Sequence, residues 1–87
     1  MRVLVWSKAS SDDLAKVPKD ASGRVIDKMV GYCETGEGNV RHLAGKSGQW
    51  RLRDANYRVI FEVSDTQVIV KRIAHRREAF REKKTLS

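Results

Sequence analysis

Apolar and polar side chains alternate in three segments of the second half of the chain, residues 49–53, 57–63 and 68–73. Successive side chains of a β-strand point to opposite faces of a sheet, so this alternation predicts three neighbouring strands. Most of the polar positions in these segments are arginine or lysine. The pattern therefore predicts a sheet with one hydrophobic face and one cationic face.

The lengths of the turns decide which side chains share a face. We expect an even-numbered turn after Arg53, such as residues 54–55, and a two-residue turn at residues 64–65, as short hairpins prefer. The predicted apolar face then consists of Trp50, Leu52, Tyr57, Val59, Phe61, Val63, Val68 and Val70. On the opposite face, this register places Arg51, Arg58 and Lys71 in a row straight across the sheet.

A row of cations is unfavourable by itself, because like charges directly opposite one another destabilise a pair of strands. The row is therefore suited to binding an anion such as phosphate. The alternative interpretation is an ordinary solvated sheet face, which many basic proteins have.

The first half of the chain predicts one strand and two helices. Residues 2–6 are rich in β-branched and aromatic side chains, which favours a short strand. Ser10, Ser11 or Asp12 can cap a first helix, and Pro18 separates it from a second one. Apolar side chains recur at spacings of three and four in the second helix, which indicates packing on the sheet rather than a groove for a partner. This stripe consists of Ala21, Val25, Ile26, Met29, Val30 and Cys33.

Two glycines, Gly36 and Gly38, end the second helix, and residues 40–43 form a short strand that leads into a glycine-containing turn. The Gly-Lys-Ser in this turn is not a Walker loop, because the first glycine of that motif is missing at the required spacing. We predict a single domain over residues 1–87 of the α+β class. It has an N-terminal strand, two helices, an antiparallel sheet of three to four strands and a short C-terminal helix.

Charge is unevenly distributed along the 87 residues. Eighteen Lys and Arg against eleven Asp and Glu give a net charge of +7. Residues 1–38 contain six basic and six acidic side chains, whereas residues 39–87 contain twelve basic and five acidic side chains. The excess of cations lies with the predicted strands and favours an acidic partner, which can be a nucleic acid, an acidic protein or a membrane surface.

Several classes of protein do not fit the sequence. No apolar run approaches the roughly 20 residues of a membrane-spanning helix, and the apolar start of the chain is too short for a signal peptide. We therefore expect a cytoplasmic protein. The single Cys33 cannot form an internal disulfide and is expected to be a buried helix residue, and His42 and His75 are too far apart in sequence for zinc-ligand spacing.

The last segment, residues 75–84, is strongly basic and predicts a short helix directly after the third strand. It places His75, Arg76 and Arg77 near the end of the cationic row. A histidine among arginines resists protonation and is suited to act as an acid or base near neutral pH. The same three residues also fit a solvated helix start.

Four motifs occur in a fixed order in the second half of the chain. They are Arg-His-Leu-Ala-Gly at 41–45, Gln-Trp-Arg-Leu-Arg at 49–53, Asn-Tyr-Arg-Val-Ile-Phe at 56–61 and Ile-Ala-His-Arg-Arg-Glu-Ala-Phe at 73–80. In this order and spacing the chain resembles the RelE/ParE superfamily of bacterial toxins, on the RelE side. The resemblance covers essentially the whole chain.

This resemblance implies a toxin of a type II toxin-antitoxin system that cleaves mRNA in the ribosomal A site. Such an endoribonuclease, or mRNA interferase, uses neither a metal nor a cofactor. The ribose 2′-hydroxyl attacks the neighbouring phosphate and leaves a cyclic phosphate and a 5′-hydroxyl. The implied partners are the ribosome, mRNA and a short acidic antitoxin, with operator DNA bound only through the antitoxin complex and no membrane contact.

The resemblance also implies roles for individual residues. It makes Arg51, Arg58, Arg76, Arg77 and His75 catalytic candidates, and Lys46, Arg53, Lys71 and Phe80 substrate-binding candidates. Planar guanidinium groups suit a metal-free reaction, because they can stabilise a phosphorane-like transition state through two hydrogen bonds at once.

One position departs from the family pattern. Many relatives have a tyrosine where this chain has Phe80, and phenylalanine can stack on a base but cannot move a proton. His75 is therefore the first candidate for proton transfer and His42 the second, while Phe80 can also be a simple apolar plug. Two other functions stay open: a ParE-like gyrase-binding toxin on the same fold, and a degenerate member that binds only its antitoxin and operator.

Overall fold

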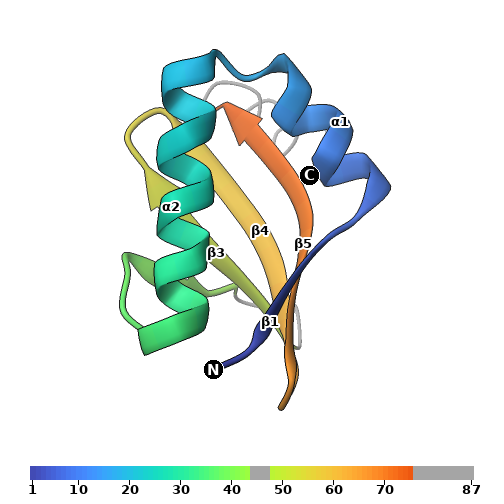
Figure 1. Ribbon diagram of the computed structural model, residues 1–87, viewed down its shortest axis with the longest axis vertical. Coiled ribbons are helices and arrows are strands. Elements are labelled where there is room, and N and C mark those ends of the chain that lie inside the picture. The colour runs from blue at the N-terminus through green and yellow to red at the C-terminus, as the bar shows by residue number, and fades with distance from the viewer. Residues whose placement is uncertain (44–47, 76–87) are drawn as a thin grey trace.

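The protein has a five-stranded mixed sheet with two helices packed beside it (Figure 1). The computed structural model describes residues 1–43 and 48–75. The elements are β1 (Val3–Trp6), α1 (Lys8–Lys16), α2 (Lys19–Thr35), β2 (Val40–His42), β3 (Gln49–Asp54), β4 (Tyr57–Val63) and β5 (Gln67–His75). This arrangement confirms the predicted α+β class.

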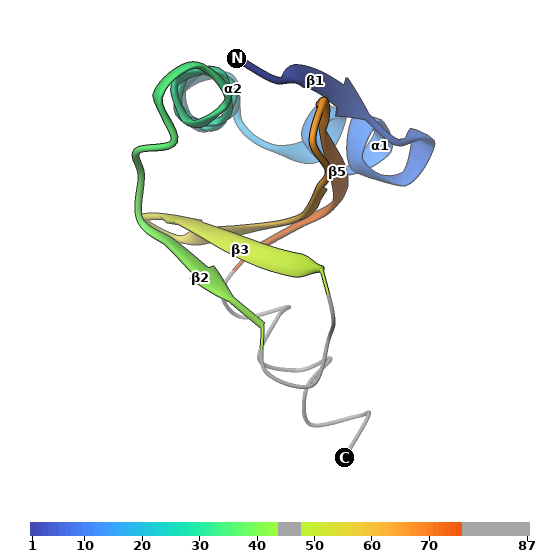
Figure 2. The same cartoon turned by 90° about the horizontal axis from the view of Figure 1, so that it is seen from below.

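The strands lie in the order β1-β5-β4-β3-β2, so the first and last strands of the chain are neighbours. β1 runs parallel to β5, and the other neighbours are antiparallel. α2 lies across one face of the sheet, and α1 lies along β5 (Figures 1 and 2). The predicted C-terminal helix falls on residues outside the described ranges, except for His75, which is the last residue of β5.

The first helix begins one turn earlier than the sequence predicts. Its N-cap is Ser7, whose hydroxyl oxygen accepts a hydrogen bond from the Ser10 backbone N–H at 3.1 Å. The Ser10 hydroxyl in turn donates to the Ser7 carbonyl oxygen at 2.9 Å and is buried. The predicted caps Ser10, Ser11 and Asp12 are therefore wrong, because the chain turns into the helix directly after β1.

The apolar stripe of α2 is narrower than predicted. Its buried residues are Ala21, Val25, Met29 and Cys33. Ile26 and Val30 lie one position further round the helix and remain 37% and 40% exposed. Gly36 ends the helix in the left-handed conformation, with φ of 76°, as the sequence predicts.

The hydrophobic core lies between α2 and the sheet face that the alternation predicts. Side chains of three strands are fully or almost fully buried against Val25, Met29 and Cys33. These strand residues are Leu52, Val59, Phe61, Val68, Val70 and Ile73. The period-two pattern therefore assigns the faces of β3, β4 and the first half of β5 correctly.

The pairing of β3 with β4 differs from the predicted one by two residues. The turn consists of residues 55–56, because Asp54 pairs with Tyr57 as part of the ladder. Both turns have even length, so the faces are unchanged. Arg51, however, lies opposite Ile60, and Arg58 lies opposite Arg53.

Asp54 explains this shift. Its carboxylate is only 3% exposed and binds two cations of α2, with Lys28 Nζ at 2.7 Å and Arg24 Nε at 3.4 Å. These contacts hold residue 54 in the strand and push the turn onto Ala55, which takes a φ of 46°.

A second difference occurs between β4 and β5. Phe61 pairs with Val70 but Ile60 pairs with Arg72, so Lys71 is an extra, unpaired residue of a β-bulge. The predicted straight row of Arg51, Arg58 and Lys71 is therefore wrong. A bulge changes which residues face each other, and alternation alone does not reveal it.

Candidate nucleic-acid interface

The sheet face that points away from α2 carries four arginines in two cross-strand pairs. Arg41 of β2 lies opposite Arg51 of β3, and Arg53 of β3 lies opposite Arg58 of β4. Residues directly opposite in an antiparallel pair have Cβ atoms about 4.5–5.5 Å apart. We call Arg41, Arg51, Arg53 and Arg58 the arginine face.

The predicted catalytic pair, Arg51 and Arg58, is brought together on this face, but diagonally. Arg51 is opposite Ile60, two residues along β4 from Arg58. Diagonal neighbours of this kind are about 7–8 Å apart, which long side chains can span. Both guanidinium groups can therefore reach one phosphate placed between the strands.

Three of the four arginines on this face lack an acidic partner among the described residues. Within residues 1–43 and 48–75, no ion pair involves Arg41, Arg51 or Arg53. The Arg51 Nε is buried and has no hydrogen-bond partner there. Arg58 Nη1 donates to the Tyr57 carbonyl oxygen at 3.4 Å. Such a surface favours an anion with several oxygen acceptors.

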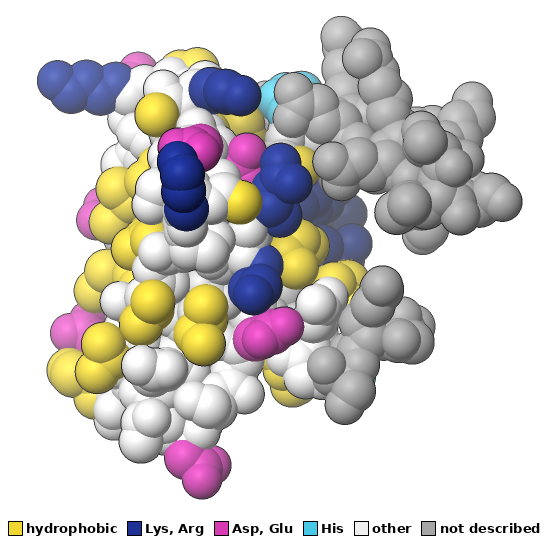
Figure 3. All heavy atoms as spheres, turned by 90° about the vertical axis from the view of Figure 1, so that its right-hand side faces the viewer, with side chains coloured by type: hydrophobic (Ala, Val, Ile, Leu, Met, Phe, Trp, Pro, Cys, Tyr) yellow, Lys and Arg dark blue, Asp and Glu magenta, His cyan; other side chains and the backbone are white. Residues whose placement is uncertain are grey.

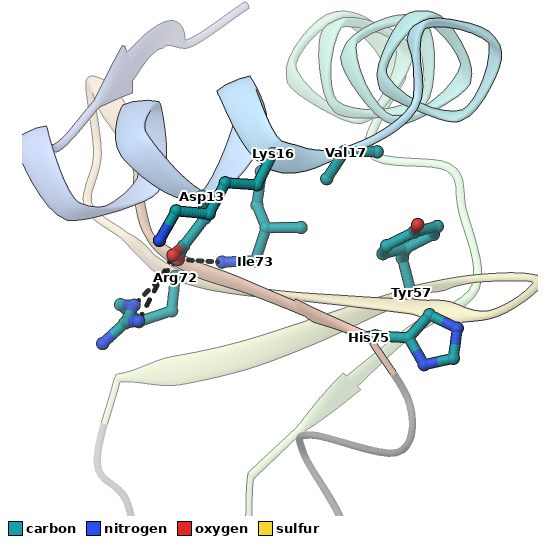
Figure 4. Close-up of a pocket in the computed structure, with 7 residues that line it drawn as sticks. All are labelled: Asp13, Lys16, Val17, Tyr57, Arg72, Ile73 and His75. Carbon is teal, nitrogen blue, oxygen red and sulfur yellow. Dashed lines mark hydrogen bonds and ion pairs between the residues drawn. The ribbon is translucent and has the colours of Figure 1, made fainter.

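A different arrangement holds Arg72 at the α1 edge. Its Nε and Nη2 donate to the Asp13 carboxylate at 2.8 and 3.2 Å, and the same carboxylate accepts the Ile73 backbone N–H at 3.0 Å (Figure 4). Cationic and acidic side chains lie next to one another on the side of the molecule that carries α1 and β5 (Figure 3). Arg72 therefore ties α1 to β5.

These contacts change the acidity of Asp13. Partial burial alone would raise the pKa of this carboxyl group. The hydrogen bonds from Arg72 and from the Ile73 backbone, with the charges of Arg72 and Lys16, outweigh burial, so the pKa lies below its ordinary value of 3.8. Asp13 is therefore ionised at neutral pH and keeps its three hydrogen bonds.

His75 does not lie on the arginine face. It pairs with Tyr57, and the two rings meet edge to face with centroids 5.3 Å apart. Both residues line a pocket of about 320 Å³ between the end of α1, the start of β4 and the end of β5 (Figure 4). The pocket is also lined by Asp13, Lys16, Val17, Arg72 and Ile73. The structure thus separates His75 from Arg51 and Arg58, and its role in proton transfer stays a prediction.

The other predicted site residues fall in three places. Arg53 is exposed on the arginine face, and Lys71 is exposed in the bulge of β5. His42 packs edge to face on Trp50, with ring centroids 4.9 Å apart. Lys46, Arg76, Arg77 and Phe80 lie outside the described residues.

The sequence does not predict the roles of three structural residues and one site residue. Asp13, Asp54 and Lys28 form contacts between residues far apart in sequence, for which no local pattern exists. Arg41 had only a weak signal, because residues 40–43 read Val-Arg-His-Leu and do not alternate between apolar and polar side chains as the longer strands do. Its pairing with Arg51 places it on the arginine face.

The rest of the described chain offers few other sites. Cys33 is buried in the core as predicted, and burial raises the pKa of its thiol. No group of three or more His, Cys, Asp or Glu side chains within the described ranges is arranged to hold a metal ion. No helix in these ranges is long and apolar enough to cross a membrane.

The fold and this face define a class of small α+β protein with an open cationic sheet. Residues 4–80 match the family described as the ParE toxin of the type II toxin-antitoxin system parDE, and the chain belongs to this family. The predicted membership of the RelE/ParE superfamily is thereby confirmed. No curated protein sequence matches the chain.

Solved toxin structures share the fold. The RelB-RelE complex from Methanococcus jannaschii matches with a TM-score of 0.78 and 21% identity, covering 90% of this chain and 96% of that one. The RelBE2 complex from Mycobacterium tuberculosis matches with a TM-score of 0.77 and 20% identity, covering 86% of this chain and 98% of that one. The E. coli DinJ-YafQ complex matches with a TM-score of 0.74 and 15% identity, covering 91% of this chain and 97% of that one. At these identities the likeness concerns the fold.

Proposed function

We propose that this toxin is a ribosome-dependent endoribonuclease that cleaves mRNA in the A site and so inhibits translation. The observation that carries the proposal is the arginine face, where three of four arginines have no carboxylate partner among the described residues. A protein with a marginal free energy of folding keeps such a repulsive arrangement at some cost. A bound phosphodiester removes that repulsion.

The proposed reaction is an internal transfer of the phosphodiester. The ribose 2′-oxygen forms a bond to phosphorus and loses its proton, while the bond to the 5′-oxygen breaks and that oxygen gains a proton. Negative charge builds up on the non-bridging oxygens in the transition state. Arg51 and Arg58 converge from neighbouring strands and stabilise this charge, and Arg53 holds the RNA backbone.

A cognate antitoxin is the second proposed partner. The similar RelB-RelE, RelBE2 and DinJ-YafQ structures are toxin-antitoxin complexes by their descriptions. On the arginine face, Ile60 lies between Arg51 and Arg72, and Ile69 lies opposite Glu62. Apolar groups among cations suit an acidic amphipathic segment. We expect this cytoplasmic toxin to meet operator DNA only through that complex.

A gyrase-binding toxin is the second candidate function, because the matching family carries the ParE description. This function needs no nuclease chemistry on the same fold. The arginine face weighs against it, since ParE-like members generally lack the complete set of arginines. A degenerate toxin that only binds its antitoxin and operator is the third outcome.

One experiment separates these functions. Purified toxin is added to translating ribosomes, and the mRNA is analysed by primer extension, while gyrase religation is measured in parallel. We expect new 5′ ends within A-site codons and normal religation. Intact mRNA with blocked religation would establish the gyrase function instead. Intact mRNA with normal religation would establish a degenerate toxin that binds only its antitoxin and operator.

A further inference from the structure

We infer that Arg41, together with Arg51, forms a second phosphate-binding site at the β2 edge of the sheet, adjacent to the pair of Arg53 and Arg58. Arg51 lies between this second site and the reacting phosphate, which it contacts with Arg58. The ligand is a phosphodiester group of a single RNA strand. This inference rests on the proposed nuclease function and extends it, because it defines the direction in which RNA crosses the protein.

The pairing across β2 and β3 carries this inference. Arg41 and Arg51 are directly opposite each other, and Arg53 and Arg58 form the next pair two residues further along β3. Because a strand rises about 3.3–3.4 Å per residue, the two pairs are roughly 7 Å apart along β3. A strand of RNA running along β3 would therefore meet the two pairs one after the other.

The charges of the edge pair point to the same ligand. Arg41 is exposed on the edge strand, and within the described part of the chain neither Arg41 nor Arg51 has an ion-pair partner. The nearest carboxylate by register is Glu62, which lies opposite Gln49 and is 3.5 Å from its amide nitrogen. Two guanidinium groups can surround one phosphate with several donors, which explains why arginine rather than lysine suits this place.

The role of Arg41 is binding rather than chemistry. It lies one strand further from Arg58 than Arg51 does, so it contacts the phosphate next to the reacting one. Contacts with phosphates of a single strand contribute about 0.7 to the slope of log affinity against log salt for each phosphate neutralised. Removal of Arg41 should therefore weaken binding for every RNA sequence and flatten that slope.

The test measures binding of a labelled 2′-O-methyl oligoribonucleotide, which cannot be cleaved, over a range of salt concentrations. Arg41→Ala should bind roughly three- to tenfold more weakly, with a slope smaller by about 0.7. Arg41→Lys should recover the slope and part of the affinity. The matched control is Lys19→Ala, which removes one exposed charge at the start of α2, on the far side of the sheet.

Two results would overturn the inference. One is an Arg41→Ala variant with the affinity and slope of the unmodified protein, and the other is an equal loss in Lys19→Ala. Cleavage on ribosomes is measured separately: here Arg41→Ala should raise KM and leave kcat nearly unchanged. If the unmodified protein cleaves nothing but the salt slope still depends on Arg41, the nuclease proposal fails and the phosphate site stands. Ribosomes with and without mRNA then distinguish messenger from ribosomal phosphates as the ligand.

Discussion

The parts of the sheet that helices cover and its open face use cations in opposite ways. On the α2 side, Lys28 and Arg24 bind the buried carboxylate of Asp54, and at the α1 edge Arg72 binds Asp13. On the other face, Arg41, Arg51 and Arg53 have no such partner among the described residues. The same side-chain chemistry therefore stabilises the fold where a helix packs on the sheet or along its edge, and remains available for a ligand where Arg41, Arg51 and Arg53 lie on the open face.

This difference shows how to interpret a net charge of +7. Net charge by itself favours any acidic partner. The structure divides the cations into those that hold helices to the sheet and those without a neutralising contact. Variants of the first kind should change stability, and variants of the second kind should change RNA cleavage.

The largest effect is expected from the catalytic pair. Arg51→Ala and Arg58→Ala should each reduce A-site cleavage by about 10²–10³-fold, as expected for loss of one group that stabilises transition-state charge. Primer extension measures the cleavage, and thermal unfolding and antitoxin binding verify that the variants are folded. Normal cleavage by both variants would show that the arginine face is not the active site.

Asp54→Ala should have the largest effect on stability. It leaves Arg24 and Lys28 of α2 without their carboxylate. Both side chains are half exposed, so hydration of their charges offsets part of the lost stability. We expect the free energy of unfolding to fall by about 1–3 kcal/mol. Urea titration measures this change.

Asp27→Ala is the matched control for Asp54→Ala, because it removes an exposed carboxylate from α2, the helix that Asp54 binds. It should change stability by less than about 0.5 kcal/mol. Equal effects of the two variants would mean that the buried ion pairs do not hold α2 to the sheet.

Asp13→Asn should show a pH-dependent effect. The pKa of Asp13 is lowered in the folded protein, so its stabilising contribution is complete above the ordinary value of 3.8 and is lost as pH falls through the lower folded value. Asp13→Asn should therefore be less stable than the unmodified protein at pH 7, and the difference should shrink at acidic pH. Thermal unfolding at several pH values measures this. A difference independent of pH would exclude the ionised carboxylate as its cause.

The smallest effect is expected at the turn that sets the register of the arginine face. Ala55 adopts a φ of 46°, which is unfavourable for a residue with a Cβ atom. Ala55→Gly should stabilise the protein by up to about 1 kcal/mol, measured by urea titration, without changing cleavage. A destabilised variant would show that the conformation of Ala55 is not strained.

Sequence alternation predicted the faces of the strands correctly but not the pairs across them. Leu52, Val59 and Phe61 lie in the core as expected, because period-two burial is a local property of each strand. The pairing depends on Asp54, which binds a helix 26 residues away in the chain, and on a bulge at Lys71. Neither feature has a local signature.

The candidate site was predictable to a similar degree. Arg51, Arg53 and Arg58 lie on one face as the alternation indicates, and Arg41 joins them through the pairing of a three-residue strand. His75 was expected beside the cationic row, but it ends a strand on the side of the apolar residues. If the third predicted strand is continued by two residues beyond Ile73, the ring of His75 falls beside Tyr57.

The parallel pairing of β1 with β5 has a consequence for the order of synthesis. The Ser7 hydroxyl donates to the Lys71 carbonyl oxygen across 64 residues of sequence. Because β1 lies at the edge of the sheet beside β5, the first strand has no partner strand until the last one exists. Pairing between segments this distant in sequence is slow, because the long chain between them must first be brought together. A nascent chain on the ribosome therefore cannot complete its sheet before nearly the whole protein is made, which delays the appearance of active toxin at the ribosome that synthesises it.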